Sequence, residues 1–440
     1  MKCKFLIVIV FFLLFLPLKT YGLSLEEEKK YGKEIYLEIT KSAALNNDPY
    51  VALYLRTMRD RLEGVASLPF PIVLTIIESQ AVDAFATIGG YVYITTGLIG
   101  LCDKEQELAG VLAHEFAHIG RRHVAKRLEK QKYINVGMLA SMLLSALVGA
   151  RESAATLAAG MGAAQAMSLK YTREDEEEAD RVGSTNADRA GYGGLGIAEF
   201  LKKIRATGTD QIVPQYLLTH PYHEERIIKI ESMWGESRIT VNAAFFPYLL
   251  VRAKILHKQL GGGMEEIWIN RYLKDKNDPL NAYAVSLIYS LKGNIGESMD
   301  VAKEINSPYK NLLLGELLLN AHRFKDAIDT LKDETDPISR YFLARAYEGD
   351  GERAMAANVL KGLLQYGETY PEIFYRLGML LGRMGQEGEG YEYLGRYYLE
   401  IGKYDIAKTH LEKAVTKYGI NSRESKEILK ILDELKKANW

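Results

Sequence analysis

The chain has 440 residues, and its 56 Lys and Arg residues nearly balance its 57 Asp and Glu residues. The composition contains no basic block, which argues against nucleic-acid binding and against electrostatic attraction to a membrane surface. A chain of this length can be stabilised by packing alone. Of its two cysteines, Cys3 lies in an N-terminal leader, and Cys102 alone cannot form an internal disulfide.

Residues 1–22 are typical of a secretory signal peptide. Two lysines precede an unbroken apolar run over residues 5–16, and Thr20 and Gly22 place small residues where a signal peptidase cleaves. The run is short for a membrane span, which favours cleavage after Gly22 over an uncleaved anchor. We therefore expect the mature protein to be secreted across the inner membrane.

A strand is predicted after a Gly-Gly turn at residues 89 and 90. The run is rich in β-branched and aromatic side chains, and it consists of Tyr91, Val92, Tyr93, Ile94 and Thr95. Such a run beside a glycine turn predicts a strand, whose ordinary place is in the core.

A helix is predicted next. Asp103 and Gln106 form a capping-box pattern, and apolar residues then recur at helical spacing without a proline, namely Leu108, Val111, Leu112 and Ile119. Within this helix His114 and His118 are four residues apart, so both imidazoles share one face and can bind one zinc ion. Glu115 can reach a zinc-bound water rather than the metal, which is the arrangement of a zinc hydrolase.

His123 is a further candidate ligand, but its spacing is wrong. It lies five residues after His118, and at about 100° per residue it leaves the zinc face if the helix continues. We therefore predict that His123 is a helix-end histidine that does not bind the metal.

A third ligand is expected from the acidic segment 171–180. Glu176 and Asp180 are four residues apart and share a helical face. One carboxylate can bind zinc while the other accepts the free ring N–H of a liganding histidine, and the spacing alone does not decide between them. The other acids of the segment are predicted to form a solvated charged turn, and they are Glu174, Asp175, Glu177 and Glu178.

An apolar segment separates the two groups of candidate ligands. Residues 136–150 are too few for an upright membrane span, and a run of small residues follows at 154–166. We expect a buried or cleft-covering helical pair; the alternative is an amphipathic element that touches a membrane.

Three ordered blocks resemble a known family. They are residues 84–98, the His-Glu-x-x-His motif at 114–118, and Thr172-Arg173-x-x-Glu176-x-x-Ala179-Asp180. Together they resemble the gluzincin metalloproteases of the HtpX and BepA kind, over residues 26–230. The resemblance is greatest to the periplasmic BepA type, in which a tetratricopeptide domain follows the protease. Thr172 stands where that family usually has Ser.

The resemblance implies a role for each matched residue. His114, His118 and Glu176 would bind one Zn²⁺ per chain, Glu115 would be the general base, and Asp180 would support the ligands. It also implies that the run Tyr91–Thr95 is an edge strand beside the zinc, to which an extended substrate adds as a further strand.

Thr219-His220-Pro221, followed by Arg226-Ile227, also resembles a block of this family. A lone histidine in a turn is usually structural or solvated. His220 is nevertheless a candidate for the open zinc position, either as a transition-state donor or as a removable fourth ligand.

After Trp234-Gly235 the pattern changes to helices alone. Small residues recur in Leu314-Gly315, Leu343-Ala344, Leu377-Gly378 and Leu394-Gly395. Gly315 to Ala344 is 29 residues and Ala344 to Gly378 is 34, near the tetratricopeptide period of about 34. The charged segment 423–437 is expected to form a polar cap.

We therefore expect an α+β fold. A mainly helical zincin-type metalloprotease domain with a small sheet would span residues 23–235, and an all-α tetratricopeptide-like solenoid would span residues 236–440. A solenoid offers a concave surface for protein partners.

The expected function is a periplasmic zinc endopeptidase that degrades misfolded or stalled outer-membrane proteins, by resemblance. Its expected partners are unfolded or misassembled envelope proteins and, through the repeats, outer-membrane assembly machinery; nucleic acid is not expected, and peripheral membrane contact is left open. The alternative is a chaperone or assembly scaffold that cleaves only occasionally. The intact Glu115 favours catalysis, because a scaffold needs no base. A membrane-embedded protease is disfavoured by the short segment 136–150.

Overall fold

The computed structural model describes residues 22–130, 137, 139–141, 143, 170–207, 215–235, 238–256 and 264–437. The predicted signal peptide, apart from Gly22, lies outside these residues, as do most of the apolar segment 136–150 and all of the run 154–166. No helix within the described ranges is both long and apolar enough to cross a membrane.

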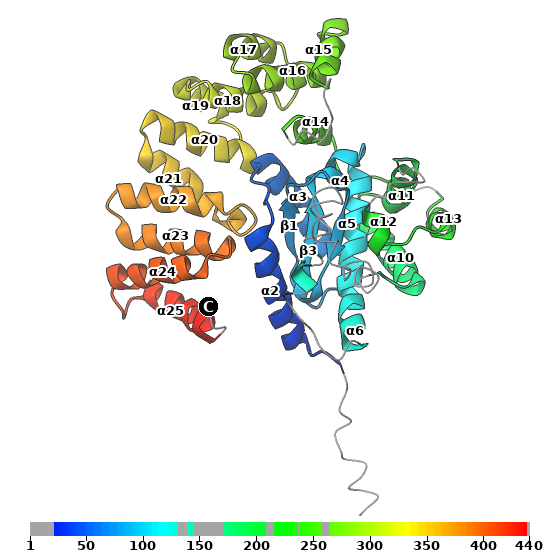
Figure 1. Cartoon of the computed structure of the whole chain (residues 1–440). Helices are drawn as coiled ribbons and strands as arrows, with labels where there is room; N and C mark the ends of the chain where they lie inside the picture. The colour runs from blue at the N-terminus through cyan, green and yellow to red at the C-terminus, as the bar shows by residue number, and fades with distance from the viewer. Residues whose placement is uncertain are drawn as a thin grey trace, which may run out of the picture.

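The first half of the chain combines a small sheet with helices (Figure 1). Its elements are α2 (Leu25–Ser42), α3 (Pro49–Glu63), β1 (Val73–Ile77), β2 (Ala84–Ala86), η1 (Ile88–Gly90), β3 (Tyr91–Thr95), α4 (Thr96–Leu101), α5 (Glu105–Gly120), α6 (His123–Lys130), α10 (Arg173–Arg189), α11 (Gly196–Thr207), α12 (Tyr216–Thr219) and α13 (Glu224–Met233). Side-chain caps fix several helix starts: Ser24 and Glu27 form a capping box on α2, Asp48 caps α3, and Thr172 and Asp175 cap α10.

The sheet has the strand order β1-β3-β2. β3 pairs in parallel with β1, from Val73 opposite Tyr91, and antiparallel with β2, where Ala84 lies opposite Ile94. The prediction that Tyr91, Val92, Tyr93, Ile94 and Thr95 form an edge strand is therefore wrong. Both sides of β3 are already paired, and all but its first residue are buried, as expected for a central strand. β2 is the strand that contacts α5.

The predicted metal-binding helix exists as α5, but its start differs from the prediction. The helix begins at Glu105, with Lys104 at the N-cap, instead of being capped by Asp103 and Gln106. The Glu107 carboxylate accepts the backbone N–H groups of Asp103 and Lys104 at 2.7 and 3.4 Å. Since α5 is buried on nearly every face, its side chains are held in fixed positions.

The second half is helical throughout its described residues. Its elements are α14 (Phe246–Leu256), α15 (Met264–Lys274), α16 (Pro279–Leu291), α17 (Ile295–Lys303), α18 (Lys310–Asn320), α19 (Phe324–Leu331), α20 (Pro337–Asp350), α21 (Arg353–Lys361), η2 (Leu364–Tyr366), α22 (Glu372–Arg383), α23 (Glu387–Glu400), α24 (Tyr404–Tyr418) and α25 (Arg423–Lys437). From α16 onward consecutive helices pack as pairs and form an arc beside the first half (Figure 1). This arrangement confirms the predicted repeat-like helical array.

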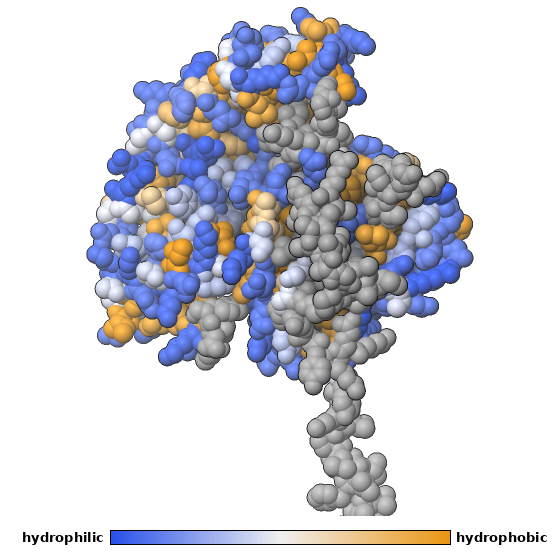
Figure 2. Space-filling model, in the orientation of Figure 1, coloured by the Kyte–Doolittle hydropathy of each residue, from blue (hydrophilic) through white to orange (hydrophobic). Residues whose placement is uncertain are grey.

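The small residues that recur in the repeats allow their helices to pack closely. A Cβ added to Gly315 would lie 2.5 Å from the Leu331 side chain, and one added to Gly378 would lie 2.9 Å from the Gly390 carbonyl oxygen. On the face in Figure 2 the surface of the repeats is largely hydrophilic, with hydrophobic residues scattered among polar ones. The apolar side chains of the repeats therefore serve mainly as internal packing.

The two halves share one hydrophobic core. A single cluster of buried side chains runs from Tyr50 in α3 through Phe116 in α5 to Leu381 in α22. The predicted domain boundary at residues 235 and 236 precedes α14, which packs against both α3 and α4. The core thus continues across the place where the sequence changes character.

A buried ion cluster lies within this junction. Arg252 of α14 binds Asp48 at 2.5 Å and Glu316 of α18 at 2.9 Å. Tyr50 donates its hydroxyl to the same Glu316 at 2.9 Å, and the Arg252 guanidinium lies over the Tyr50 ring at 4.2 Å. Because all three charged side chains are buried, each depends on the others for compensation.

Candidate metal and catalytic site

Close packing of α10 on α5 brings the two predicted ligand segments together. The decisive residue is Gly183 of α10, where an added Cβ would lie only 2.8 Å from the His114 Cα. No larger residue would let the two backbones approach so closely. As a result Glu176 and Asp180, both on the first turns of α10, face the histidines of α5.

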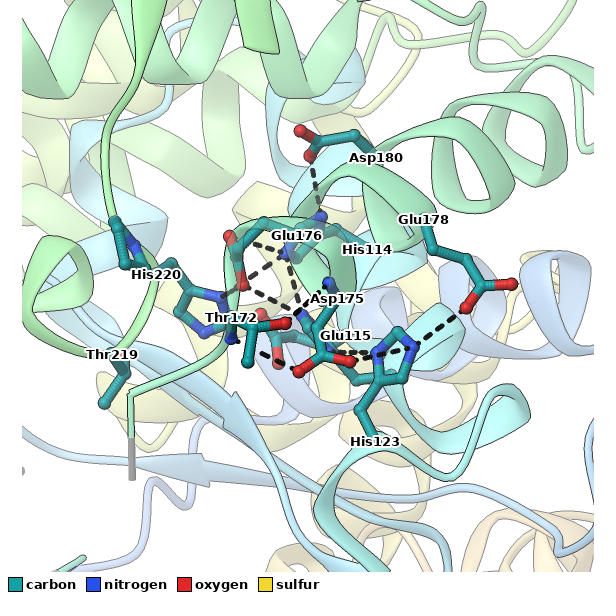
Figure 3. Close-up of polar contacts among 12 residues, drawn as sticks. His114, Glu115, His123, Thr172, Asp175, Glu176, Glu178, Asp180, Thr219 and His220 are labelled. Carbon is teal, nitrogen blue, oxygen red and sulfur yellow. Dashed lines mark hydrogen bonds and ion pairs between the residues drawn. The ribbon is translucent and has the colours of Figure 1, made fainter. Parts of the chain in front are cut away.

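Four buried side chains converge on one point (Figure 3). One potential ligand atom from each of His114, His118, Glu176 and His220 lies within 4.8 Å of all the others. His114 Nε2 lies 3.0 Å from His118 Nε2, and His220 Nδ1 lies 3.0 Å from Glu176 Oε1. Three imidazoles and one carboxylate are a donor set suited to zinc.

The protonation states also fit a cation. Burial holds the pKa of His118 well below its ordinary value, so the ring is neutral and can offer a lone pair. Burial opposes ionisation of Glu176, but His220 and Arg226 outweigh it and hold the pKa of this carboxyl well below its usual range. The neutral His118 ring and the ionised Glu176 carboxylate, 3.4 Å apart, are ligand types that match Zn²⁺.

Asp180 lies behind His114, as the spacing allowed. Its Oδ1 is 3.0 Å from His114 Nδ1, while His114 Nε2 faces the cluster. Asp180 is itself held by Arg226, whose Nε and Nη2 donate to the two carboxylate oxygens at 2.6 and 2.7 Å. The carboxylate is therefore fixed on both sides.

Arg226 is the principal residue that the sequence did not assign. It is 2 % exposed, and its Nη1 also lies 2.6 Å from Glu176 Oε2. That contact leaves Glu176 Oε1 directed at His118 and His220. Arg226 further donates to the Pro221 carbonyl at 3.0 Å and so fixes the turn that carries His220. The only sequence signal was its place in the block with His220.

Glu115 lies beside the cluster and is fully buried. Its Oε1 is 3.4 Å from His220 Nε2. Burial, together with the charges of Glu176 and Asp83, raises the pKa of Glu115 well above its ordinary value. A carboxylate with a raised pKa can accept and return a proton, which is what a general base requires.

His220 stands at the end of α12, where its backbone N–H donates to the Tyr216 carbonyl at 3.0 Å. The imidazole stacks on the Tyr216 ring with centroids 4.4 Å apart. Its two nitrogens face different acids, Nδ1 toward Glu176 and Nε2 toward Glu115. The structure thus places His220 among the possible ligands. This position is the one that the hypothesis of a removable fourth ligand requires.

Other predicted residues fall into two groups. His123 is not part of the four-residue cluster, in line with its spacing, but its ring contacts His118. Glu174 is exposed, as predicted, but it lies in helix α10 and not in a turn. Asp175 and Glu178 differ from that expectation, because both lie near His123 Nε2, at 3.7 and 3.2 Å.

Comparison with known proteins agrees with this geometry. Residues 49–234 match the model of peptidase family M48. The chain is a metalloendopeptidase that is similar to family M48 over these residues. The matched M48 region contains every residue of the metal cluster, and the resemblance to the HtpX and BepA kind is confirmed.

Several curated proteins are similar to this chain. The "Beta-barrel assembly-enhancing protease" of Escherichia coli (strain K12) is 27 % identical over 358 residues, which cover 77 % of this chain and 73 % of the relative. The protein of the same name from Yersinia pestis is 31 % identical over 244 residues, or 53 % of this chain and 49 % of the relative. A "Protease HtpX homolog" of Desulfatibacillum aliphaticivorans is 42 % identical over 98 residues, or 21 % and 30 % of the two chains.

Proposed function

We propose that this protein is a periplasmic zinc endopeptidase that degrades misfolded or stalled outer-membrane proteins. The observation that carries the proposal is the buried convergence of His114, His118 and Glu176 beside Glu115. The substrate class is supported by the relatives named for β-barrel assembly and by the predicted signal peptide over residues 1–22.

Each residue of the site has a distinct part in peptide hydrolysis. His114, His118 and Glu176 would hold the zinc, and Asp180 and Arg226 would keep His114 and Glu176 in place. Bound zinc supplies a Lewis acid that polarises a carbonyl oxygen and acidifies water. Glu115 accepts the proton of the attacking water and passes it to the leaving amine.

His220 would regulate access to the metal. Since it reaches the cluster, it fills the position that a catalytic zinc site keeps open for substrate. A fourth protein ligand would keep the enzyme idle until substrate displaces the turn. The alternative role is donation to the developing oxyanion, for which substrate would have to bind with His220 still in place.

The substrate would bind as an added strand on β2 rather than on β3. β2 is an edge of the described sheet and packs on α5, which carries Glu115. An extended peptide on that edge would lie parallel to the sheet, next to the catalytic residues. Main-chain hydrogen bonds give affinity with little sequence demand, which suits unfolded substrates.

Docking of substrates or of assembly machinery would be the task of the repeats. We assign hydrolysis to residues 23–235 and docking to residues 236–440. The arc of paired helices supports this division, because stacked helix pairs form extended binding surfaces (Figure 1). A chaperone or assembly role with occasional proteolysis is the second candidate, favoured by the closure of the metal cluster by His220.

The deciding experiment compares the purified full-length protein with Glu115→Gln on an unfolded outer-membrane β-barrel protein. Loss of a general base typically costs on the order of a hundredfold in rate. We expect at least that loss, with zinc content unchanged, because Glu115 is not among the four convergent ligands. Glu174→Gln is the matched control, since Glu174 is exposed, and it should cleave like the wild type.

Cleavage by Glu115→Gln at the wild-type rate would contradict the assigned mechanism. If Glu115→Gln loses cleavage but still supports barrel assembly in cells, the chaperone role is the main one. The compartment is tested separately by fractionating cells, where recovery of the mature protein in the cytoplasm would contradict the periplasmic assignment.

A further inference from the structure

The two histidines of α5 have different partners behind their metal-facing nitrogens. His114 Nδ1 faces the Asp180 carboxylate at 3.0 Å. His118 Nδ1 instead faces a second imidazole, with His123 Nδ1 at 2.9 Å. Both His118 and His123 are buried. Metal-binding histidines usually rely on carboxylates, carbonyls or water for this contact.

The backbone is bent to place His123 there. α5 ends at Gly120, and Arg122 adopts a φ of 56°, a left-handed conformation that is unfavourable for residues other than glycine. This bend turns the chain, so His123 begins α6 on the side of His118 rather than continuing around α5. The prediction that His123 lies off the zinc face assumed one continuous helix. The bend between α5 and α6 breaks that helix, so the His123 ring lies against His118.

The unfavourable turn is held by a buried charge. The Arg122 Nε donates to Glu28 Oε1 at 2.6 Å, and its Nη2 donates to the Leu23 carbonyl at 2.5 Å. Glu28 is only 2 % exposed. A left-handed residue whose guanidinium is held by two contacts indicates that the position of the next residue matters, since strained conformations persist where surroundings enforce them.

Only one arrangement of protons satisfies the whole chain of contacts. His118 Nε2 faces the metal cluster, 3.4 Å from Glu176 Oε1, so metal binding leaves the His118 proton on Nδ1. That Nδ1–H must donate, and His123 Nδ1 must accept. The proton of His123 is then on Nε2, which lies 3.2 Å from Glu178 Oε2.

We propose that His123 is a positioning residue for the metal centre: its Nδ1 accepts the His118 Nδ1–H and thereby fixes the tautomer and ring orientation of that ligand. Glu178 in turn fixes the tautomer of His123, and Asp175 at 3.7 Å adds a second acid on the same side. The centre thus has two unlike supports, a carboxylate clamped by arginine behind His114 and a neutral imidazole behind His118.

The test uses three full-length variants that change the acceptor and the neighbouring packing separately. His123→Leu removes the acceptor with a similar side-chain volume. His123→Asn keeps an acceptor oxygen as many bonds from the backbone as the imidazole Nδ1. Val124→Ala trims the adjacent half-buried residue and controls for general disturbance of α6.

Two measurements are made without substrate, so the result does not depend on the proposed function. The zinc dissociation constant is measured by competition with a chromogenic chelator, and the visible absorption spectrum is recorded after loading with Co²⁺. Loss of a partner behind a metal ligand typically weakens affinity roughly tenfold to a hundredfold. We expect that loss and an altered Co²⁺ spectrum for His123→Leu, and values close to the wild type for His123→Asn and Val124→Ala.

Equal zinc affinity in His123→Leu and the wild type would overturn the proposal. Equal losses in His123→Leu and His123→Asn would also overturn it, because both would then reflect packing alone. If His123→Leu does not fold, His123→Gln replaces it, since its amide oxygen and nitrogen reach the Nε2 position and place the amide carbon, which cannot accept a hydrogen bond, at the Nδ1 position. His123→Gln should then bind zinc more weakly than His123→Asn, and the opposite order would refute the role.

Discussion

Two buried arginines in this molecule each join two carboxylates, yet they serve different ends. Arg226 joins Asp180 and Glu176 behind the metal cluster, and Arg252 joins Asp48 and Glu316 at the junction with the repeats. Each arginine compensates charges that burial would otherwise make costly.

The difference lies in which other groups the oxygen atoms of these four carboxylates contact. At the junction they are used by the fold itself, since Asp48 Oδ1 caps α3 at the Tyr50 N–H and Glu316 Oε2 also accepts the Tyr50 hydroxyl. At the metal site they are turned toward imidazoles, as with Glu176 Oε1 and Asp180 Oδ1. A buried ion cluster therefore indicates a functional site when its carboxylate oxygens also face imidazoles that can bind a metal, and not only groups that hold the fold together.

The largest effect is expected when a metal ligand is removed, and it is loss of the metal. His118→Ala and Glu176→Gln each remove one of the convergent donors, so both should lose most of the zinc and all measurable cleavage. Elemental analysis of the purified proteins against wild type measures this. Full stoichiometric zinc in both variants would show that the ligand assignment is wrong.

Removing the structural arginine should cost stability but not metal. Arg252→Met leaves Asp48 and Glu316 buried without compensation, which typically destabilises by about 3–5 kcal/mol. The shift of the chemical denaturation midpoint measures it, while zinc affinity should stay at the wild-type value. Lys361→Met is the control, because its pair with Glu389 is partly exposed and is worth about 1 kcal/mol or less. A similar small shift in both variants would remove the structural role of Arg252.

The support behind His114 should have an intermediate effect. Asp180→Ala removes the acceptor of His114 Nδ1, so zinc affinity should fall roughly tenfold to a hundredfold without being abolished. Chelator competition gives the dissociation constant. If affinity and cleavage were both unchanged, Asp180 would serve only as a partner for Arg226, and the two arginine clusters would be equivalent.

The effect whose sign is most informative is expected at His220. If His220 caps the metal, His220→Ala should raise basal cleavage severalfold while zinc stays bound to the other three residues. If it is an oxyanion donor, the same change should lower cleavage by roughly 3 kcal/mol in transition-state stabilisation. A protease assay on the metal-loaded variant separates these outcomes, and an unchanged rate would eliminate both roles.

Local patterns in the sequence predicted much of this structure. The apolar period of α5, the four-residue spacings and the charged last helix α25 depend on residues close in the chain, and their helices appear where expected. The structure also brings the predicted ligands together. His114 and His118 lie on α5, and Glu176 and Asp180 lie on α10, so only the packing of α10 against α5 depends on the rest of the fold.

The features that the sequence missed depend on distant partners. Arg226 and Arg252 bind acids 46, 204 and 64 residues away, which no local pattern reveals. The central position of β3 depends on which strands pair with it, not on its own residues. The contact of His123 with His118 was missed because a non-glycine residue, Arg122, takes a left-handed turn that is held by distant contacts with Glu28 and Leu23.

The continuous core between α3 and α22 makes the distance from the repeats to the catalytic centre a fixed length. Domains joined by a small polar contact usually swing, whereas a large shared apolar interior resists such motion. If the repeats dock substrates as proposed, the length of the unfolded part of a docked polypeptide would decide whether it reaches the catalytic centre. Only a chain with enough unfolded residues to bridge that gap would reach the scissile position, so the degree of unfolding, rather than sequence, would select what is cut.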